Sequence, residues 1–242
     1  MKVILIFTLI LLLINSGNSL ATDVNIVTES FPPFITVNKN QISGLITNRV
    51  KKIMDISQLS YSLTAYPWAR SYQIASSQAN TLIFSIIKSP ERAPFFYWFC
   101  PVYTSSPFFA FKLKGNAAKI DSISELKKVF VGTARHGINH EHLKKLGFEA
   151  GKNLDVSATE DINIKKLING RVDAVVQSAE TFDYRLKKLG YENVEVIQGV
   201  AINEDKPLIH CLALNINSDP LIRDKITQAF LKYQNTSNSS FP

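Results

Sequence analysis

The chain has 242 residues, of which 45% are hydrophobic and 19% are charged, and its formal net charge at pH 7 is +7. This composition excludes a fibrous or low-complexity chain and supplies enough apolar residues for one large domain or two smaller lobes. The basic residues form no arginine-rich stripe or RNA-binding signature, which argues against nucleic-acid binding. The charge instead suits contact with anionic surfaces or anionic solutes.

The first residues predict export. Lys2 is followed by an apolar run over 3–14, and "SLA" at 19–21 matches the small-x-small pattern of a secretory cleavage site after Ala21. The run is short for a helix that spans a bilayer, although an uncleaved membrane anchor is the alternative. We therefore expect 1–21 to be a signal peptide and the remaining chain to work in the periplasm.

After residue 21, strand-like and helix-like segments alternate. The first series predicts strands over 23–29, 61–66 and 81–87, with helices over 45–57 and 68–77. The second series predicts helices over 123–128, 140–147, 161–170 and 179–190, with strands over 129–133, 173–177 and 194–198. This alternation predicts an α/β fold with mainly parallel sheets. Its right-handed crossovers would put ligand crevices at the carboxyl ends of the strands.

Two strand-like runs, 105–115 and 206–216, interrupt this alternation and bracket the second series, and a final helix is predicted over 220–233. The simplest arrangement is two α/β lobes joined by two hinge strands, with a cleft between the lobes. We expect lobe 1 to comprise 22–105 plus 213–242 and lobe 2 to comprise 106–212.

Cys100 and Cys211 are the only cysteines of the chain. An oxidising compartment permits a disulfide between them. Both residues also lie in apolar, strand-like runs, where a buried free thiol is equally reasonable. The sequence leaves the two alternatives open.

Several motifs resemble one family over essentially the whole chain after the signal peptide. They are "SFPPF" at 30–34, "SPER" at 89–92, "VDAVVQS" at 172–178 and "LALNINSDPLIRDKITQAF" at 212–230. Together they are similar to the family 3 periplasmic solute-binding proteins, the type II two-lobed receptors that deliver polar amino acids and related solutes to ABC importers. The motif "YPWAR" at 66–70 further resembles a divergent branch of that family.

The resemblance implies a periplasmic-binding-protein type II fold. It also implies a monomer without a cofactor that captures a small solute in the cleft by hinge closure. The loaded protein would serve ABC import or sensing, with an ABC permease or a membrane sensor as its partner.

The resemblance also implies ligand-binding residues in the first lobe. Arg92 matches the arginine that binds the α-carboxylate of the ligand, a task suited to the bidentate fork of a guanidinium. A surface cation beside an aromatic strand is the alternative for this residue. Phe31 matches the aromatic residue that covers the ligand, Trp68 a contact at the start of a helix, and Ser85 with Ile87 the segment ahead of Arg92.

In the second lobe the sequence departs from the family pattern. The usual anion-binding segment is replaced by Gly137, Ile138 and Asn139, whose backbone N–H groups could still bind an anion. The carboxylate that holds the ligand's ammonium group is replaced by Ser178, and Glu180 is the nearest acidic substitute. We therefore expect an anionic or zwitterionic solute that carries a carboxylate, an amino acid or a related compound.

Two other hypotheses follow from the same sequence. His136, His140 and His142, beside Glu141, could offer ligands to zinc or nickel, although solvated or capping histidines are the simpler interpretation. The fold is also used by dehydratases and by cell-wall lytic enzymes, in which a carboxylate such as Glu180 could act as acid or base. No convincing catalytic constellation supports an enzyme, which remains the alternative function.

Overall fold

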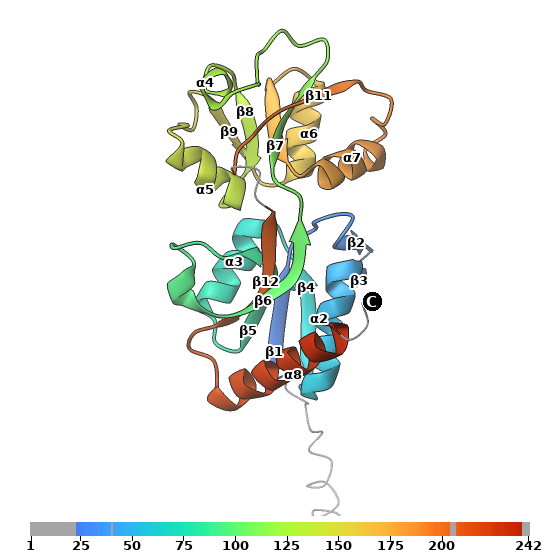
Figure 1. Cartoon of the computed structure of the whole chain (residues 1–242), viewed down its shortest axis with the longest axis vertical. Coiled ribbons are helices and arrows are strands. Elements are labelled where there is room, and N and C mark those ends of the chain that lie inside the picture. The colour runs from blue at the N-terminus through green and yellow to red at the C-terminus, as the bar shows by residue number, and fades with distance from the viewer. Residues whose placement is uncertain (1–22, 40, 204–206, 239–242) are drawn as a thin grey trace, which may run out of the picture.

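The computed structural model describes residues 23–39, 41–203 and 207–238, which form two lobes stacked end to end (Figure 1). The predicted signal peptide, 1–21, lies outside the described residues. No helix in the described ranges is both long and apolar enough to cross a membrane.

The first lobe contains a five-stranded sheet in the order β4-β1-β5-β12-β6. Its strands are β1 (Val24–Thr28), β4 (Tyr61–Ala65), β5 (Thr81–Ile87), β6 (Phe96–Ser105) and β12 (Leu208–Asn215). The other elements of this lobe are a hairpin of β2 (Thr36–Asn38) and β3 (Gln41–Ser43), the helices α2 (Leu45–Ser57), α3 (Trp68–Ser77) and α8 (Pro220–Asn238), and the short η1 (Ala93–Phe95). Strand β1 is parallel to β4 and β5, whereas β12 is antiparallel to β5 and β6.

Both faces of this sheet are covered by helices, because successive side chains of a strand point to opposite faces. Ile26 and Leu82 pack in a buried cluster with residues of α2 and α8, which also contact each other. Their neighbours Val27 and Ile83 pack in a second cluster on the α3 side. The near-continuous apolar sequence of β5 follows from burial on both faces.

The second lobe repeats this arrangement with a sheet in the order β11-β7-β10-β8-β9. Its strands are β7 (Phe109–Leu113), β8 (Val131–Ala134), β9 (Leu154–Ser157), β10 (Ala174–Gln177) and β11 (Val196–Ala201), and its helices are α4 (Ile123–Leu126), α5 (Ile138–Lys145), α6 (Glu160–Ile168) and α7 (Ala179–Lys188). Strands β8, β9 and β10 are parallel, and β7 is antiparallel to β10 and β11. The predicted α/β class with mainly parallel sheets in two lobes is confirmed.

Strand β9 was missed by the sequence interpretation, which passed directly from one helix to the next. It pairs with β8 at the edge of the second sheet. Only its first and last residues, Leu154 and Ser157, are buried, so its sequence shows no apolar alternation.

The chain crosses between the lobes twice. β6 ends in the first sheet at Ser105 and β7 begins in the second at Phe109. β12 brings the chain back, and it pairs with β6 from Leu208 onward. This pairing places the chain in the first sheet five residues before the boundary at 213 that we expected from the sequence.

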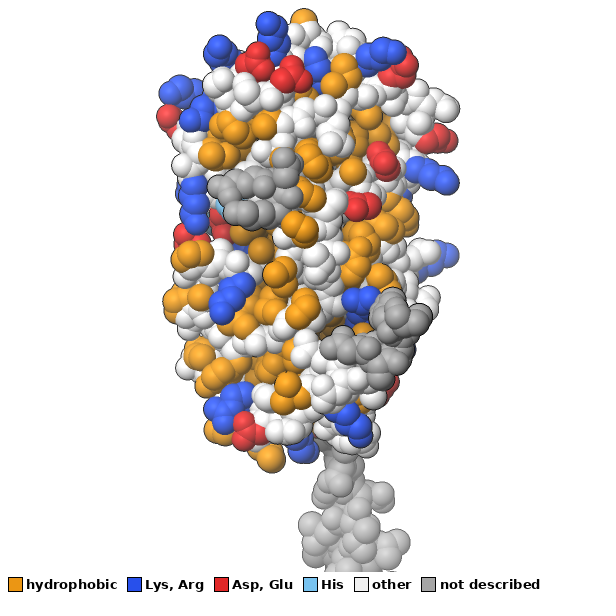
Figure 2. Space-filling view, in the orientation of Figure 1, with side chains coloured by type: hydrophobic (Ala, Val, Ile, Leu, Met, Phe, Trp, Pro, Cys, Tyr) orange, Lys and Arg blue, Asp and Glu red, His pale blue; other side chains and the backbone are white. Residues whose placement is uncertain are grey.

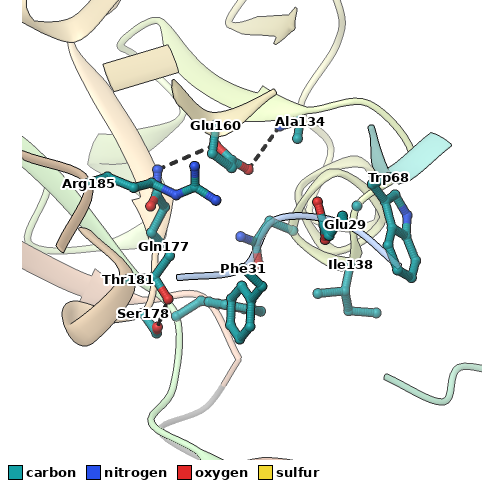
Figure 3. A pocket seen from close by; sticks show the side chains of 13 residues that line it. Glu29, Phe31, Trp68, Ala134, Ile138, Glu160, Gln177, Ser178, Thr181 and Arg185 are labelled. Carbon is teal, nitrogen blue, oxygen red and sulfur yellow. Dashed lines mark hydrogen bonds between the residues drawn. The ribbon is translucent and has the colours of Figure 1, made fainter. Parts of the chain in front are cut away.

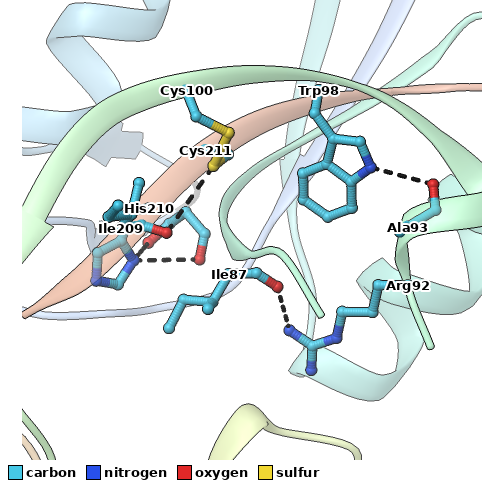
Figure 4. Close-up of a disulfide and its surroundings, with 9 residues drawn as sticks. Ile87, Arg92, Ala93, Trp98, Cys100, Ile209, His210 and Cys211 are labelled. Atoms are coloured by element: carbon cyan, nitrogen blue, oxygen red, sulfur yellow. Dashed lines mark hydrogen bonds between the residues drawn. A yellow bond between two sulfur atoms is a disulfide. The ribbon is translucent and has the colours of Figure 1, made fainter. Parts of the chain in front are cut away.

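A disulfide joins Cys100 in β6 to Cys211 in β12, with a Cα–Cα distance of 4.6 Å and a sequence separation of 111 residues (Figure 4). The two strands are neighbours in the first sheet, where Phe99 lies opposite Leu212. The disulfide therefore links the two strands of the first lobe that are connected to the second lobe.

The basic residues are distributed over both lobes. On the face shown in Figure 2, lysine and arginine side chains stand among acidic and apolar ones and do not gather into one patch. Pairs such as Lys144–Lys145 and Lys187–Lys188 are exposed on their helices, as expected for solvated helix faces.

Candidate functional site

A cavity with a volume of about 70 Å³ lies between the two lobes (Figure 3). β1 ends directly before Glu29, while β8 and β10 end at Ala134 and Gln177. All three residues line the cavity, which therefore lies at the carboxyl ends of parallel strands, where α/β folds bind ligands. The cavity is lined by Glu29, Phe31, Trp68, Phe108, Ala134, Gly137, Ile138, Asn139, Glu160, Gln177, Ser178, Thr181 and Arg185.

A second compartment of about 50 Å³ shares part of this wall and extends it toward Arg92 and His210. Between them, the two compartments are lined by every binding residue predicted from the sequence except Glu180: Phe31, Trp68, Ser85, Ile87, Arg92, Gly137, Ile138, Asn139 and Ser178. Glu180 is exposed and accepts a hydrogen bond of 2.6 Å from Ser106, between β6 and β7.

The guanidinium of Arg92 is buried, with 1% of the residue exposed, and its donors are engaged within the protein. Its Nη2 and Nε donate to Glu141 Oε1 at 2.8 and 3.2 Å. Its Nη1 donates to the carbonyl of Ile87 and its Nη2 to that of His136, both at 3.0 Å. The ring of Trp68 lies 4.9 Å from the guanidinium carbon, so Arg92 is not the surface cation of the alternative interpretation.

Glu141 belongs to α5 of the second lobe and thus gives Arg92 a carboxylate from across the cleft. Ser89 of the first lobe also donates to Glu141, at 3.4 Å. A second link, between Lys145 and Glu91 at 2.8 Å, is exposed on both sides and adds little stability. Arg92 therefore contacts a carboxylate of the protein itself, the same chemical group that the resemblance assigns to its ligand.

Two acidic residues that the sequence analysis did not single out face the cavity from opposite lobes. Glu160, the first residue of α6, accepts hydrogen bonds from the Ala134 N–H at 3.1 Å, from Asn163 at 2.8 Å and from Gln177 at 3.4 Å. Burial raises the pKa of Glu160 above its ordinary value despite these bonds. Burial likewise raises the pKa of Glu29 to about 7, although the nearby positive charge of Arg185 acts to lower it.

Arg185 reaches the cavity from α7 and also links the lobes. Its Nη2 donates to the carbonyl of Ser30 in the first lobe at 3.0 Å, and its Nη1 is bonded to Asp161. The indole N–H of Trp68 similarly donates to the carbonyl of His136. Together with the pair of Arg92 and Glu141, these bonds hold the lobes in direct contact.

The sequence carried a signal for some of the residues that were overlooked. Glu29 and Gln177 end predicted strands, so the rule that ligands bind at the carboxyl ends of parallel strands could have found them. Glu160 follows β9, the strand that was missed, and its position at the cleft was missed for that reason. Arg185 lies in the middle of α7, where no local pattern distinguishes it from the other basic residues.

The histidine group does not supply a metal site in the part of the chain that the structure describes, where no group of three or more His, Cys, Asp or Glu residues could hold a metal ion. His136 precedes α5, and its backbone N–H donates to the Nδ1 atom of His140 at 3.1 Å. Burial lowers the pKa of both His140 and His142, which favours the neutral forms.

The sequence matches no protein-family model. It also matches no curated protein.

Solved structures are similar to this chain in fold. A histidine kinase sensor domain with similarity to periplasmic binding proteins superposes with a TM-score of 0.76 at 16% identity, covering 89% of this chain and 91% of that chain. The arginine-, lysine-, histidine-binding protein ArtJ from Geobacillus stearothermophilus gives a TM-score of 0.74 at 20% identity, with the same coverage of 89% and 91%. A putative L-cystine ABC transporter protein from Listeria monocytogenes gives 0.71 at 18% identity, covering 89% and 92%. The chain therefore has the predicted periplasmic-binding-protein type II fold.

Proposed function

We propose that this protein is a periplasmic solute-binding protein that captures a small carboxylate-bearing solute, an amino acid or a related compound, between its lobes. The observation that supports this most is the cavity at the carboxyl ends of β1, β8 and β10, lined by polar and aromatic side chains of both lobes. Among proteins of the same fold, ArtJ binds arginine, lysine and histidine. The loaded protein would pass its solute to an ABC permease or report it to a membrane sensor.

Solute entry requires the lobes to move apart. The two inner compartments, of about 70 and 50 Å³, are smaller than the roughly 300–1,000 Å³ of typical ligand pockets. An open groove of about 310 Å³, also lined by Glu29, Trp68 and Glu160, provides a route from solvent. We propose that the crossings from β6 to β7 and from β11 to β12 act as hinges, the usual device for closure around a ligand.

Arg92 is our candidate for the residue that binds the solute's carboxylate. Because Glu141 lies on the opposite lobe, separation of the lobes would withdraw its carboxylate and expose the guanidinium. A solute carboxylate could then take its place and accept from Nε and Nη2, the two donors that Glu141 Oε1 now occupies. Arg92 is thereby held in position by Glu141 until a solute arrives.

A thermal-shift screen of the wild-type protein against amino acids, small carboxylates and short peptides tests the function. A solute that binds only the folded state must raise the melting temperature. We expect the best of these solutes to lose about tenfold or more in affinity in Arg92→Ala and to recover part of that in Arg92→Lys, since a point charge cannot reproduce the fork. Arg171→Ala, which removes an exposed arginine, is the matched control.

Wild-type affinity in Arg92→Ala would remove Arg92 from the proposal, and a screen without any stabilising solute would contradict the function itself. No feature of the residues that the structure describes supports the alternative of an enzyme on the same fold.

A further inference from the structure

One carbonyl oxygen of the second lobe is bonded to two side chains of the first. The carbonyl of His136, in the turn between β8 and α5, accepts a hydrogen bond of 3.0 Å from Arg92 Nη2 and another from the indole N–H of Trp68. Both side chains are buried, and both line the second compartment of the cleft. The position of this single oxygen therefore affects how closely the two lobes meet.

The turn that presents this oxygen has an unfavourable backbone conformation. His136 has a φ of 56°, in the left-handed region that residues other than glycine rarely adopt. A residue keeps such a conformation only where its surroundings hold it there. Backbone bonds on both sides contribute: Arg135 donates its N–H to the Ser157 carbonyl at 2.9 Å, and Gly137 donates to the Ala134 carbonyl at 3.2 Å. A further support comes from a side chain of α5.

That side chain is His140, in the first turn of α5. The N–H of His136 donates to its Nδ1 atom at 3.1 Å. A side chain that reaches back from the first turn to an N–H before the helix resembles a capping box, with an imidazole nitrogen in place of the usual carboxylate or amide oxygen. An Nδ1 that accepts this bond carries no proton, so the imidazole is neutral with its hydrogen on Nε2. Protonation would turn the acceptor into a donor that faces another donor.

The surroundings of His140 favour the neutral form. Burial lowers the pKa of His140 below its ordinary value of 6.5, and the charges of Lys144 on the same helix and of His136 and Arg135 in the turn lower it further. The positive end of the helix dipole acts in the same direction. The bond from His136 is therefore intact above pH 6.5 and is lost as the pH falls through the lowered pKa.

We propose that His140 is a positioning residue for the contact between the lobes and makes that contact sensitive to pH. Neutral His140 fixes the turn so that the His136 carbonyl meets Trp68 and Arg92. The imidazolium releases the N–H of His136, the turn relaxes from its left-handed conformation, and the carbonyl moves out of line with its two donors. Loss of one hydrogen bond of ordinary strength would lower the ratio of closed to open molecules by about fivefold.

The test follows the emission of Trp68 without any solute, so its outcome is independent of the proposed function. Trp68 and Trp98 are the only tryptophans of the chain, and a Trp98→Phe parent isolates the signal of Trp68. Only 4% of Trp68 is exposed, so separation of the lobes would bring its indole into water and move the emission maximum to longer wavelength. We expect this shift in the parent as the pH falls from about 8 to about 5. Small-angle X-ray scattering should show a larger radius of gyration over the same range.

Three variants of this parent assign the effect. His140→Leu removes the acceptor and should show the longer wavelength already at pH 8. His140→Asn should keep the shorter wavelength throughout, because its Oδ1 takes the place of Nδ1 and does not titrate. His142→Asn is the matched control and should shift as the parent does, since the Nδ1 of His142 has no hydrogen-bond partner among the described residues. Glu29 and His210 also titrate at the cleft, and a shift that persisted in His140→Asn would point to them.

An emission maximum in His140→Leu equal to that of the parent at pH 8 would overturn the positioning role. A shift in His140→Asn equal to that of the parent, or a parent without any shift, would overturn the sensitivity to pH. If circular dichroism shows that His140→Leu is unfolded, the comparison of the parent with His140→Asn decides the proposal. A stabilising solute in the thermal screen, together with a parent without any shift, would leave the function standing and overturn the role of His140.

Discussion

Arg92 and Glu141 form an ion pair that joins the two lobes, with 2.8 Å between Nη2 and Oε1. Only 2% of the Arg92 side chain and 24% of the Glu141 side chain are exposed. The pair thus stabilises the contact between the lobes. In the proposed function, Glu141 also competes with the solute's carboxylate for the Arg92 guanidinium.

Removing one member of this pair should destabilise the protein. We expect Arg92→Ala to lower the free energy of unfolding by about 3 kcal/mol, the lower end for breaking a buried pair, because Glu141 keeps some contact with water. Arg92→Lys should cost less, since it retains the charge. Urea denaturation of the variants measures this difference, and wild-type stability in Arg92→Ala would show that the pair contributes nothing.

Glu141 should compete with a solute carboxylate. We expect Glu141→Gln to bind an anionic or zwitterionic solute about tenfold more tightly, a gain of about 1.4 kcal/mol, because an amide is a weaker partner for the guanidinium than a carboxylate is. Calorimetric titration of the wild type and the variant gives the ratio. Unchanged or weaker binding in Glu141→Gln would mean that Glu141 does not occupy the solute's position.

Glu29 should make stability fall as the pH rises. Its pKa is about 7 in the folded protein against an ordinary value of 4.5, so between these values the native state retains a proton that the unfolded state has lost. Stability due to this group is present below pH 4.5 and is lost by pH 7, a change of up to about 3 kcal/mol. Glu29→Gln should lack this fall in denaturation curves recorded across the range, and parallel curves would refute the assignment.

His210 should act in the opposite direction at acid pH. It is buried in β12, with Nε2 at 2.9 Å from Ser105 Oγ and Nδ1 at 3.1 Å from Ser85 Oγ. Burial lowers its pKa from 6.5 to about 4. The stability that the neutral ring contributes is present above pH 6.5 and is lost as the pH falls to 4, by about 3 kcal/mol.

The matched variant is His210→Gln, which should lose less stability over this acid range than the wild type does. Because the effects of Glu29 and His210 oppose each other between pH 4.5 and 6.5, each variant must be compared with the wild type rather than with a flat baseline. An identical acid dependence would exclude His210 as the group responsible.

The disulfide should stabilise the fold without taking part in binding. It closes a loop with a sequence separation of 111 residues, and neither cysteine lines the inner cavities. We expect reduction, or the double change Cys100→Ala and Cys211→Ala, to lower the free energy of unfolding by about 2–5 kcal/mol. Solute affinity of the folded variant should stay within about twofold, and a large loss of affinity would assign the disulfide a role in the cleft.

The alternation of strands and helices could be predicted from the sequence, because the apolar pattern of a strand is local. That pattern is clear in β1, β5, β8 and β10. It failed for β9, which is short, lies at a sheet edge and has two partly buried residues, Asp155 and Val156, at its centre. Glu160 was overlooked as a consequence. The partnership of Arg92 with Glu141 had no local signal, since it depends on how two separately folded lobes meet.

The most direct test of binding in the cleft uses Trp68, which lines both inner compartments. The chain has two tryptophans, and in Trp98→Phe the emission would report on Trp68 alone. Titration of that variant with the best solute of the thermal screen should give a saturable change in emission, with a midpoint equal to the calorimetric dissociation constant. Unchanged Trp68 emission under a solute that calorimetry shows to bind would place binding outside the cleft and contradict the account.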